Sequence, residues 1–388
     1  MRILVIHNFY QHAGGEDTVF RQEVEELEKE HDVETLTFQN KKGWRGALQY
    51  LTYPWNIRAT WKVKKIIKSF APDIVHIHNL HYSSGPLLIS SAYQLGIPVV
   101  MTLHNFRLLC PSASLFCRGR IFTDSIYQDF PWTAVRLRVL DNSFTKTFFT
   151  AFTYWIHRKW RTWDKVSKFI VLSQFSKSLF VESTFPIAEE RFIVRPNSTD
   201  IIPTVRTAGS GFVYIGRLSQ EKGIVPLLKA FSTLPFPLSI YGSGPQQNIV
   251  EDFAKHYKNI QYFGYQSKDL LTKAIKHAEA LIVPSVCYEG MPMTIIEAFA
   301  QGTPVLASNI GILNKMVLPL YTGMHFNPYD ETDIGRVVTE WEKLDQTTKR
   351  QIRENCATEY KKHYTVKKNM DKLMDIYYEV IQQQKEKQ

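Results

Sequence analysis

The sequence predicts an α/β protein built from two doubly wound domains, each with a parallel sheet. Short apolar segments rich in β-branched residues recur along the chain, and each is followed by a polar loop and a helical segment, the order that builds a parallel sheet. The length of 388 residues indicates two domains. Hydrophobic content of 44% and charged content of 22% are ordinary for a globular protein and exclude a fibrous or disordered class.

The first domain is predicted to begin with a buried strand at residues 2–6, followed by a loop over 7–17 and a helix over 18–30. The loop contains Gly14 and Gly15. Backbone N–H groups at such a glycine loop and helix N-terminus can bind an anion such as phosphate, although paired glycines are also common in ordinary turns. The dinucleotide-binding spacing G-x-G-x-x-G is absent, which disfavours a nicotinamide oxidoreductase.

Further strands of the first domain are predicted at residues 33–38, 72–79, 98–103, 168–173 and 191–194. His104 directly follows one of them. Ligands of parallel sheets bind at the carboxyl ends of the strands, so His104 lies where a substrate is expected. A lone histidine is more often structural or exposed, and that interpretation stands beside the functional one.

Two stretches of the first half, residues 41–68 and 112–165, mix cationic and large aromatic side chains. They are interpreted as solvated helix surfaces with core tryptophans, as a surface that stacks on nucleic acid bases, or as a surface that lies on anionic lipid headgroups. The formal net charge of +10 fits an anionic partner without choosing among these.

The second domain is predicted to follow a polar linker at about residues 196–210. Strands are expected at residues 212–215, 238–241 and 260–265. Arg217 and Lys222 follow the first of these strands. A guanidinium offers a fork for two oxygens and an ammonium a point charge, so the pair suits a pyrophosphate. Taken alone, the segment is more typical of a solvated basic loop.

Residues 280–308 predict a strand–loop–helix–strand unit of a parallel sheet. The expected elements are a strand over 280–286, a loop over 287–291, a helix from Pro292 to about Gln301 that ends at Gly302, and a strand over 304–308.

Two glutamates lie eight residues apart in this unit, Glu289 in the loop and Glu297 in the helix. Glu297 has apolar neighbours and no Lys or Arg within four residues on either side, so no ion pair within the helix can satisfy it. A buried carboxylate needs a partner, and a ribose diol is one suitable partner. The alternative is a glutamate that faces solvent.

The segment EGMPMTIIEAFAQGTPVLAS, with Glu289 and Glu297, resembles the E-x7-E signature of retaining glycosyltransferases of family 4. The resemblance extends over nearly the whole chain and implies the GT-B fold, in which two Rossmann-like domains face each other across a cleft. It implies an N-terminal acceptor domain over 1–196, completed by a terminal helix over 367–388, and a C-terminal donor domain over 205–366.

The resemblance also implies transfer of a sugar from a UDP- or GDP-sugar to an acceptor hydroxyl with retention of configuration. It further implies that the leaving phosphate accepts the proton of the acceptor, on the same face of the sugar. Glu297 is expected to hold the ribose, and Glu289 the sugar hydroxyls together with the amides of 290–292. The expected catalytic residues are Glu289, Arg217, Lys222 and His104. The expected donor-binding residues are Gly14, Gly15, Glu297, Gly290, Met291, Pro292, Gly242, Gly244 and Tyr265.

No D-x-D sequence occurs, so we expect neither a catalytic metal nor a cofactor. The expected partners are the nucleotide-sugar donor, a lipid-linked or saccharide acceptor and an anionic membrane surface, not nucleic acid. The apolar run at 3–6 is too short for a signal peptide, no run suffices for a spanning helix, and the four cysteines are expected to be free thiols. These features predict a cytoplasmic protein, peripheral at the inner face of a bacterial membrane, in surface-polysaccharide synthesis. The alternatives are a non-catalytic anionic-polymer binding protein and a GT-B nucleotide-sugar epimerase.

Overall fold

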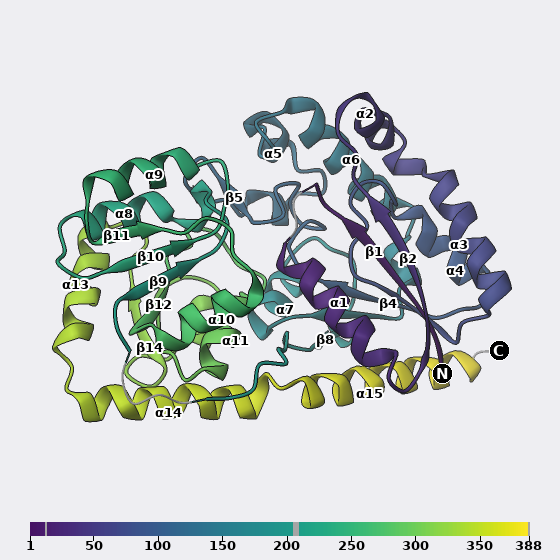
Figure 1. Ribbon diagram of the computed structural model, residues 1–388. Coiled ribbons are helices and arrows are strands. Elements are labelled where there is room, and N and C mark those ends of the chain that lie inside the picture. The colour runs from purple at the N-terminus through teal and green to yellow at the C-terminus, as the bar shows by residue number, and fades with distance from the viewer. Residues whose placement is uncertain (12–13, 205–208, 387–388) are drawn as a thin grey trace. The chain divides into compact units, whose positions relative to one another are not determined.

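The computed structural model describes residues 1–11, 14–204 and 209–386, and these form two compact units (Figure 1). Unit 1 comprises Met1–Leu115, Phe122–Pro196 and Lys367–Gln388, and unit 2 comprises Phe116–Ile121 and Asn197–Val366. Residues 12–13 of the predicted glycine loop, 205–208 of the predicted linker and 387–388 of the predicted terminal helix lie outside the described residues.

Unit 1 contains a six-stranded parallel sheet in the order β2-β1-β3-β4-β7-β8. In chain order, β2 is added on one side of β1 and β3 on its other side. The direction in which strands are added therefore reverses between β1 and β3, although all strands remain parallel. In register, Val5 lies between Thr35 of β2 and His76 of β3. The strands are β1 Arg2–Phe9, β2 Asp32–Gln39, β3 Ile74–Ile77, β4 Val99–Leu103, β7 Lys168–Val171 and β8 Phe192–Val194.

The helices of unit 1 separate these strands in the chain. Asn56 begins α3 by accepting a hydrogen bond from the Ala59 amide at 3.0 Å, and Ser143 begins α6 in the same way from the Lys146 amide. The α-helices are α1 Gly15–Leu27, α2 Gly43–Leu51, α3 Ile57–Phe70, α4 Leu87–Gln94, α5 Trp132–Leu137, α6 Phe144–Lys159, α7 Gln174–Val181 and α15 Val366–Lys385. The short 3-10 helices are η1 Tyr53–Trp55, η2 Asp124–Tyr127, η3 Trp163–Lys165 and η4 Glu189–Arg191.

Unit 2 repeats the plan with the sheet order β11-β10-β9-β12-β13-β14, again parallel throughout. The strands are β9 Phe212–Ile215, β10 Leu238–Tyr241, β11 Ile260–Tyr262, β12 Ala280–Val283, β13 Val305–Ser308 and β14 Gly323–Phe326. The helices are η5 Gln220–Lys222, α8 Ile224–Ser232, α9 Gln247–His256, α10 Lys268–His277, α11 Met293–Ala300, α12 Leu313–Met316, α13 Glu331–Lys343 and α14 Gln346–His363. A hairpin of β5 Phe116–Cys117 and β6 Arg120–Ile121 also belongs to this unit.

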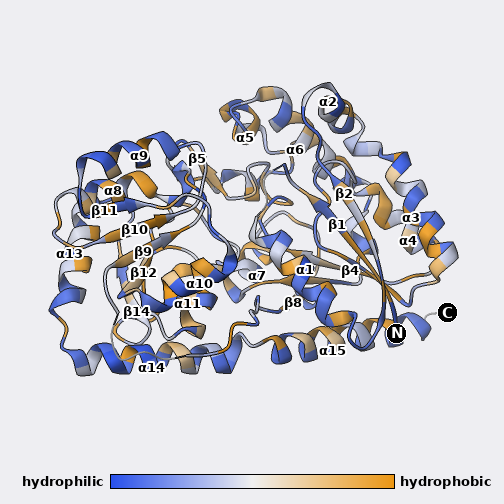
Figure 2. Ribbon diagram, in the orientation of Figure 1, coloured by the Kyte–Doolittle hydropathy of each residue, from blue (hydrophilic) through white to orange (hydrophobic). Residues whose placement is uncertain are grey.

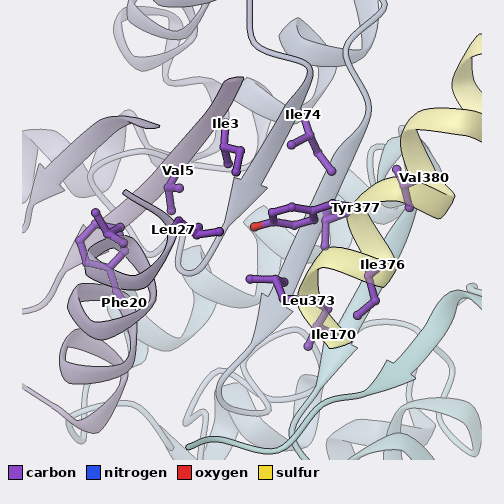
Figure 3. Packing of buried hydrophobic residues seen from close by; sticks show 12 residues of the cluster. Ile3, Val5, Phe20, Leu27, Ile74, Ile170, Leu373, Ile376, Tyr377 and Val380 are labelled. Carbon is purple, nitrogen blue, oxygen red and sulfur yellow. The ribbon is translucent and has the colours of Figure 1, made fainter. Parts of the chain in front are cut away.

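The last helix, α15, carries both hydrophobic and hydrophilic residues (Figure 2) and completes the core of unit 1. Figure 3 shows its apolar side chains facing β1, β3 and α1. These side chains, spaced by three or four positions so that they share one face of the helix, are Leu373, Ile376, Tyr377 and Val380. The exposed side contributes an ion pair of 2.9 Å between Glu379 and Lys168.

The predicted fold class is confirmed, while several element ends differ from their predicted positions. Strand β12 ends at Val283 rather than at residue 286, because Pro284 cannot donate to the ladder. Helix α11 begins at Met293, with Pro292 as its N-cap, and Gly302 follows it at φ 62. Helix α1 begins at Gly15, three residues earlier than predicted, because Asp17 caps it.

All four cysteines are free thiols. Within the described parts of the chain, no helix combines the length and the apolar character required to cross a membrane.

Replacing Leu373 by Ala should destabilise unit 1 by about 2–5 kcal/mol, because it removes a fully buried side chain from the α15 contact and leaves a cavity. The matched control, Tyr378→Ala, removes a side chain of the same helix that is 59% exposed and should change stability by less than about 0.5 kcal/mol. Urea unfolding followed by circular dichroism measures both. Equal midpoints for the two variants would contradict the packing role of α15.

Candidate functional site

The sheet of unit 2 reverses its winding between β9 and β12, which pair directly. In open α/β sheets the loops at the carboxyl ends of the strands form the ligand site at this position. Arg217 and Lys222 follow β9, and Glu289 follows β12. The residues predicted to meet the leaving diphosphate and the sugar are therefore on the two adjacent loops at the reversal.

An ion pair joins these two loops. The Lys222 ammonium donates to Glu289 Oε1 at 2.6 Å, and the Ser285 hydroxyl donates to the same oxygen at 2.6 Å. The Val286 amide also donates to the Glu221 carbonyl at 2.9 Å. Burial opposes the charge of Lys222, but Glu289 and the neighbouring acidic groups outweigh it and raise the pKa of Lys222, so this side chain remains a cation.

Two glycines let the neighbouring loops of this edge approach closely. A Cβ at Gly242, which has φ +137, would lie 1.9 Å from the Gly216 carbonyl oxygen, and a Cβ at Gly244 would lie 2.4 Å from that of Leu218. Only residues without a side chain fit there. The Gly242 amide donates to the Gly264 carbonyl at 2.8 Å. Gly242 and Gly244, two of the predicted donor-binding glycines, therefore have a packing role in the structure.

Arg217 and Tyr265 are exposed at the same edge of the sheet. The Tyr214 hydroxyl donates to the Arg217 carbonyl at 2.8 Å, which fixes the backbone while the guanidinium stays exposed. Tyr265 follows β11 and is 79% exposed. Both side chains are accessible to a ligand of unit 2.

Glu297 lies on α11, and its side chain is partly buried. Burial raises the pKa of Glu297, and the Asp200 carboxylate adds to this while Lys268 opposes it. Lys268 itself is paired with Asp200 at 2.8 Å. Among the described residues, none donates a hydrogen bond to the Glu297 carboxylate. An acceptor of this kind suits a ligand that donates two hydroxyl groups.

The backbone before α11 is held by Asn197. The Asn197 side-chain amide donates to the Met291 carbonyl at 3.2 Å, and its backbone amide lies 3.2 Å from the Met291 sulfur. Gly290, Met291 and Pro292 are partly buried. Asn197 belongs to the segment that the sequence predicts as a linker, and it fixes a predicted donor-binding loop.

A cavity of about 750 Å³ also lies in unit 2, beside the N-termini of α8 and α13. Its lining includes Gln220, Gln246 and Tyr329 but none of the predicted site residues. The predicted residues thus lie outside this cavity.

In unit 1, the glycine loop before α1 differs from the anion site that the sequence predicts. The Gly14 amide donates to Asp17 Oδ2 at 3.0 Å, and Asp17 Oδ1 lies 2.7 Å from His7 Nε2. The Gly14 N–H is therefore bound within the protein, and among the described residues only the Gly15 amide of this pair lacks an internal acceptor. Two carboxylates, Glu16 and Asp17, occupy the first turn of α1.

Glu16 is a further candidate site residue, which the sequence analysis did not single out. Asn79, after β3, donates to Glu16 Oε1 at 3.3 Å, and Asn105, after β4, donates to Oε2 at 3.2 Å. Burial, together with the nearby Asp17 carboxylate, raises the pKa of Glu16 to about 7. The available signal was its position directly after the glycine pair, in the first turn of the helix that follows β1.

His104 follows β4 and is partly buried. His104 Nε2 lies 3.0 Å from His78 Nδ1, and His78 Nε2 lies 2.9 Å from Glu23 Oε1. Burial, with the neighbouring His78 and His7, lowers the pKa of His104 well below its ordinary value, so the ring is neutral. Sequence analysis missed His78 and Glu23, although His78 directly follows a buried strand.

The two basic-aromatic stretches meet within unit 1. The Tyr50 hydroxyl of α2 donates to the Lys146 carbonyl of α6 at 2.6 Å, and the Trp55 ring lies 6.1 Å from Phe152 and 6.3 Å from Trp160 between centroids. We give the name aromatic surface to nine exposed apolar side chains of the two stretches. It consists of Trp44, Leu48, Leu51, Trp55, Ile57, Trp61, Trp132, Phe144 and Trp160, which are 44–73% exposed.

Family comparisons cover both units. Residues 13–201 match the family described as Glycosyltransferase Family 4, and residues 207–359 match Glycosyl transferases group 1. One curated relative, an uncharacterized glycosyltransferase of Methanocaldococcus jannaschii, is 30% identical over 140 residues, 33% of this chain and 36% of that protein. The lipopolysaccharide 1,2-N-acetylglucosaminetransferase of Salmonella typhimurium is 29% identical over 211 residues, 46% of this chain and 55% of that protein. This chain therefore aligns with only about a third of the first relative and half of the second.

Solved structures match over nearly the whole chain. Sucrose-phosphate synthase from Thermosynechococcus elongatus has a TM-score of 0.72 at 17% identity, covering 97% of this chain and 98% of that one. HepE of Anabaena in complex with UDP has a TM-score of 0.69 at 16% identity, covering 98% and 100%. These matches show the GT-B fold. With the two family matches, they establish that the chain belongs to the GT-B glycosyltransferases of the family 4 type.

Replacing Glu297 by Gln should leave the ligand-free protein as stable as the parent or more stable at pH 8. The pKa of Glu297 is raised, so the folded state holds this proton more tightly than the unfolded chain, and ionisation costs stability as pH rises through the raised pKa. The difference should vanish near pH 4. Melting temperatures at both pH values, with the exposed Glu25→Gln as control, measure it. A lower melting temperature for Glu297→Gln at pH 8 would mean that the carboxylate already has a stabilising partner.

Proposed function

We propose that this protein is a retaining, metal-independent glycosyltransferase that moves a hexose-type sugar from a UDP- or GDP-sugar to an acceptor hydroxyl. The observation that carries the proposal is the ion pair of Lys222 with Glu289 on the two loops at the reversal of the second sheet, with Arg217 exposed on the same loop as Lys222. Family membership supports glycosyl transfer, and the HepE complex with UDP supports a uridine nucleotide.

In the proposed reaction, the bond between the anomeric carbon and the leaving phosphate oxygen breaks as the acceptor oxygen bonds to the same face of the sugar. The acceptor proton passes to the leaving phosphate. Arg217 and Lys222 stabilise the negative charge that develops on the diphosphate, an effect that counts most where the cations are already in place. Glu297 accepts hydrogen bonds from the ribose diol, and Glu289 holds Lys222 while it accepts from sugar hydroxyls.

Arg217→Ala should lower turnover at least tenfold, and Glu297→Ala should lower it severely, while both variants keep the parental fold. Lys255→Ala is the matched control: it removes one exposed cation from the last turn of α9, at the opposite edge of the same sheet. Release of the nucleoside diphosphate, in the presence of EDTA, measures turnover across a panel of nucleotide sugars. Parental turnover in Arg217→Ala or Glu297→Ala would remove that residue from the site.

The same panel separates the competing functions. A specific donor raises the melting temperature by mass action. Incubation of the donor without an acceptor should leave the sugar unchanged, whereas an epimerase would isomerise it. An anionic-polymer binding protein would turn over no donor and would bind nucleic acid with steep dependence on salt. The anomeric proton coupling of the product reports retention.

We further propose that the acceptor is a lipid-linked saccharide and that unit 1 lies on an anionic membrane, at the inner face of the cell membrane. The aromatic surface supports this, because tryptophans such as Trp44 and Trp61 are 73% and 63% exposed and have cations beside them. Aromatic rings with Lys and Arg are the composition of interfacial helices. The Salmonella relative acts on lipopolysaccharide by its name, which agrees with a lipid-anchored acceptor.

Replacing Trp44 and Trp61 together by Ser should weaken co-sedimentation with phosphatidylglycerol vesicles by roughly fivefold or more, because two interfacial anchors are lost. Tyr93→Ser, which removes an exposed aromatic of α4 outside the aromatic surface, should bind as the parent does. Phosphatidylcholine vesicles should bind the parent weakly. Equal binding by both variants would dissociate the aromatic surface from membrane attachment.

A further inference from the structure

A chain of three hydrogen-bonded side chains leads to His104 from inside unit 1. It begins at Glu23 of α1, continues through His78 after β3, and ends at His104 after β4. The two links are 2.9 Å from Glu23 Oε1 to His78 Nε2 and 3.0 Å from His78 Nδ1 to His104 Nε2. The planes of the two imidazole rings are inclined by only 21°. The proposed reaction assigns no task to Glu23 or His78.

Glu23 fixes the direction of the first hydrogen bond. Arg195 donates to Glu23 Oε2 at 2.5 Å, and His76 Nδ1 lies 2.9 Å from Oε1. Burial opposes the charge of Glu23, but Arg195 and the two histidines outweigh it and hold the pKa of Glu23 well below its ordinary value. An ionised carboxylate only accepts hydrogen bonds, so the proton on this link belongs to His78 Nε2.

The direction of the second hydrogen bond then follows. Burial, opposed by Glu23, lowers the pKa of His78 to about 4, so its ring is neutral and carries a single proton. With that proton on Nε2, His78 Nδ1 can only accept, and His104 Nε2 must donate to it. His104 is neutral as well, which leaves its Nδ1 as a bare acceptor. No described residue donates to this atom.

We infer that Glu23 and His78 are positioning residues that hold His104 in the Nε2–H tautomer, so that Nδ1 accepts a hydrogen bond from a hydroxyl of the substrate. The inference rests on the proposed function, sugar transfer, and assigns that hydroxyl to the transferred sugar. It also gives a specificity: the substrate must donate at this position, because a bare imidazole nitrogen gains nothing from a hydrogen or fluorine atom there.

The same groups also have the composition of a metal site, since ligand atoms of Glu23, His76 and His78 lie within 4.8 Å of one another. These ligand atoms, however, already have partners within the protein. Arg195 occupies one Glu23 oxygen, and the two histidines share the other. His76 Nδ1 also lies 2.6 Å from the Tyr377 hydroxyl. The cluster is thus satisfied internally, which favours the tautomer relay.

The experiment is a long-range ¹H–¹⁵N spectrum of the full-length protein labelled at histidine, recorded at pH 7. It distinguishes protonated from bare ring nitrogens, with assignments from His78→Gln and His104→Gln. We expect His78 and His104 each to carry one proton, on Nε2. His157 is an internal reference, because its Nε2 donates to the Pro54 carbonyl at 2.8 Å and must be protonated. A wild-type His104 protonated on Nδ1, or on both nitrogens, overturns the inference.

Glu23→Gln tests the relay directly. With its oxygen on Arg195, the new amide presents N–H to His78 Nε2, so both histidines should move to the Nδ1–H tautomer and kcat/KM should fall roughly tenfold or more. The wild-type protein should prefer the parent donor over a donor sugar that lacks the recognised hydroxyl. In Glu23→Gln this preference, measured as the ratio of the two kcat/KM values, should shrink by a similar factor. His157→Gln, a buried histidine outside the relay, should change neither tautomers nor kcat/KM. Folded Glu23→Gln with wild-type tautomers and kcat/KM overturns the inference.

The two failures are distinguishable. If the wild-type protein turns over no nucleotide sugar, the proposed function is wrong, and the spectra still show whether Glu23 sets the tautomer of His104. If sugar transfer is present but His104 is in the other tautomer, only the inference is lost.

Discussion

The ion pair between Lys222 and Glu289 is the constraint on which the candidate site depends. It joins the loops after β9 and β12, the two adjacent strands at which the second sheet reverses its winding. Removing one partner would leave the other as an uncompensated, partly buried charge, which is far costlier than losing both. Ser285 completes the contact by donating to the same carboxylate oxygen. The positions of Arg217 and of the loop before α11 follow from this link, because both belong to the segments that it ties together.

The two units differ in how far their polar side chains are paired within the protein. At the carboxyl edge of the first sheet, nearly every named polar side chain has an internal partner, as Asp17 has in Gly14 and His7, and as Glu23 has in Arg195. Such networks make a region rigid when every member is satisfied. In unit 2, Arg217 is exposed and Glu297 has no described hydrogen-bond donor. The first unit thus holds His104 in a fixed position, with an Nδ1 to which no described residue donates, while the second keeps the side chains of Arg217 and Glu297 available for a ligand.

Sequence patterns located the strands well because the pattern that defines a buried strand is local. β9 and β10 have the predicted bounds, whereas β1 extends to Phe9 because polar residues such as Asn8 still pair with β2. The bond between Lys222 and Glu289 could not be predicted, since it depends on which strands become neighbours. The hydrogen bond from the Gly14 amide to Asp17 could not be predicted either, because a glycine pair alone does not show where its amides point.

The contribution of α15 to the first core has a consequence for how the chain matures during synthesis. Leu373 and Tyr377 are fully buried against residues of β1, β3 and α1, yet they are made after the whole of unit 2. While the ribosome is still translating unit 2, the first sheet has an uncovered apolar face. The N-terminal unit therefore cannot reach its final stability first, in contrast to the usual order for proteins with several domains. A chaperone that shields apolar surface would have its longest period of contact with this face.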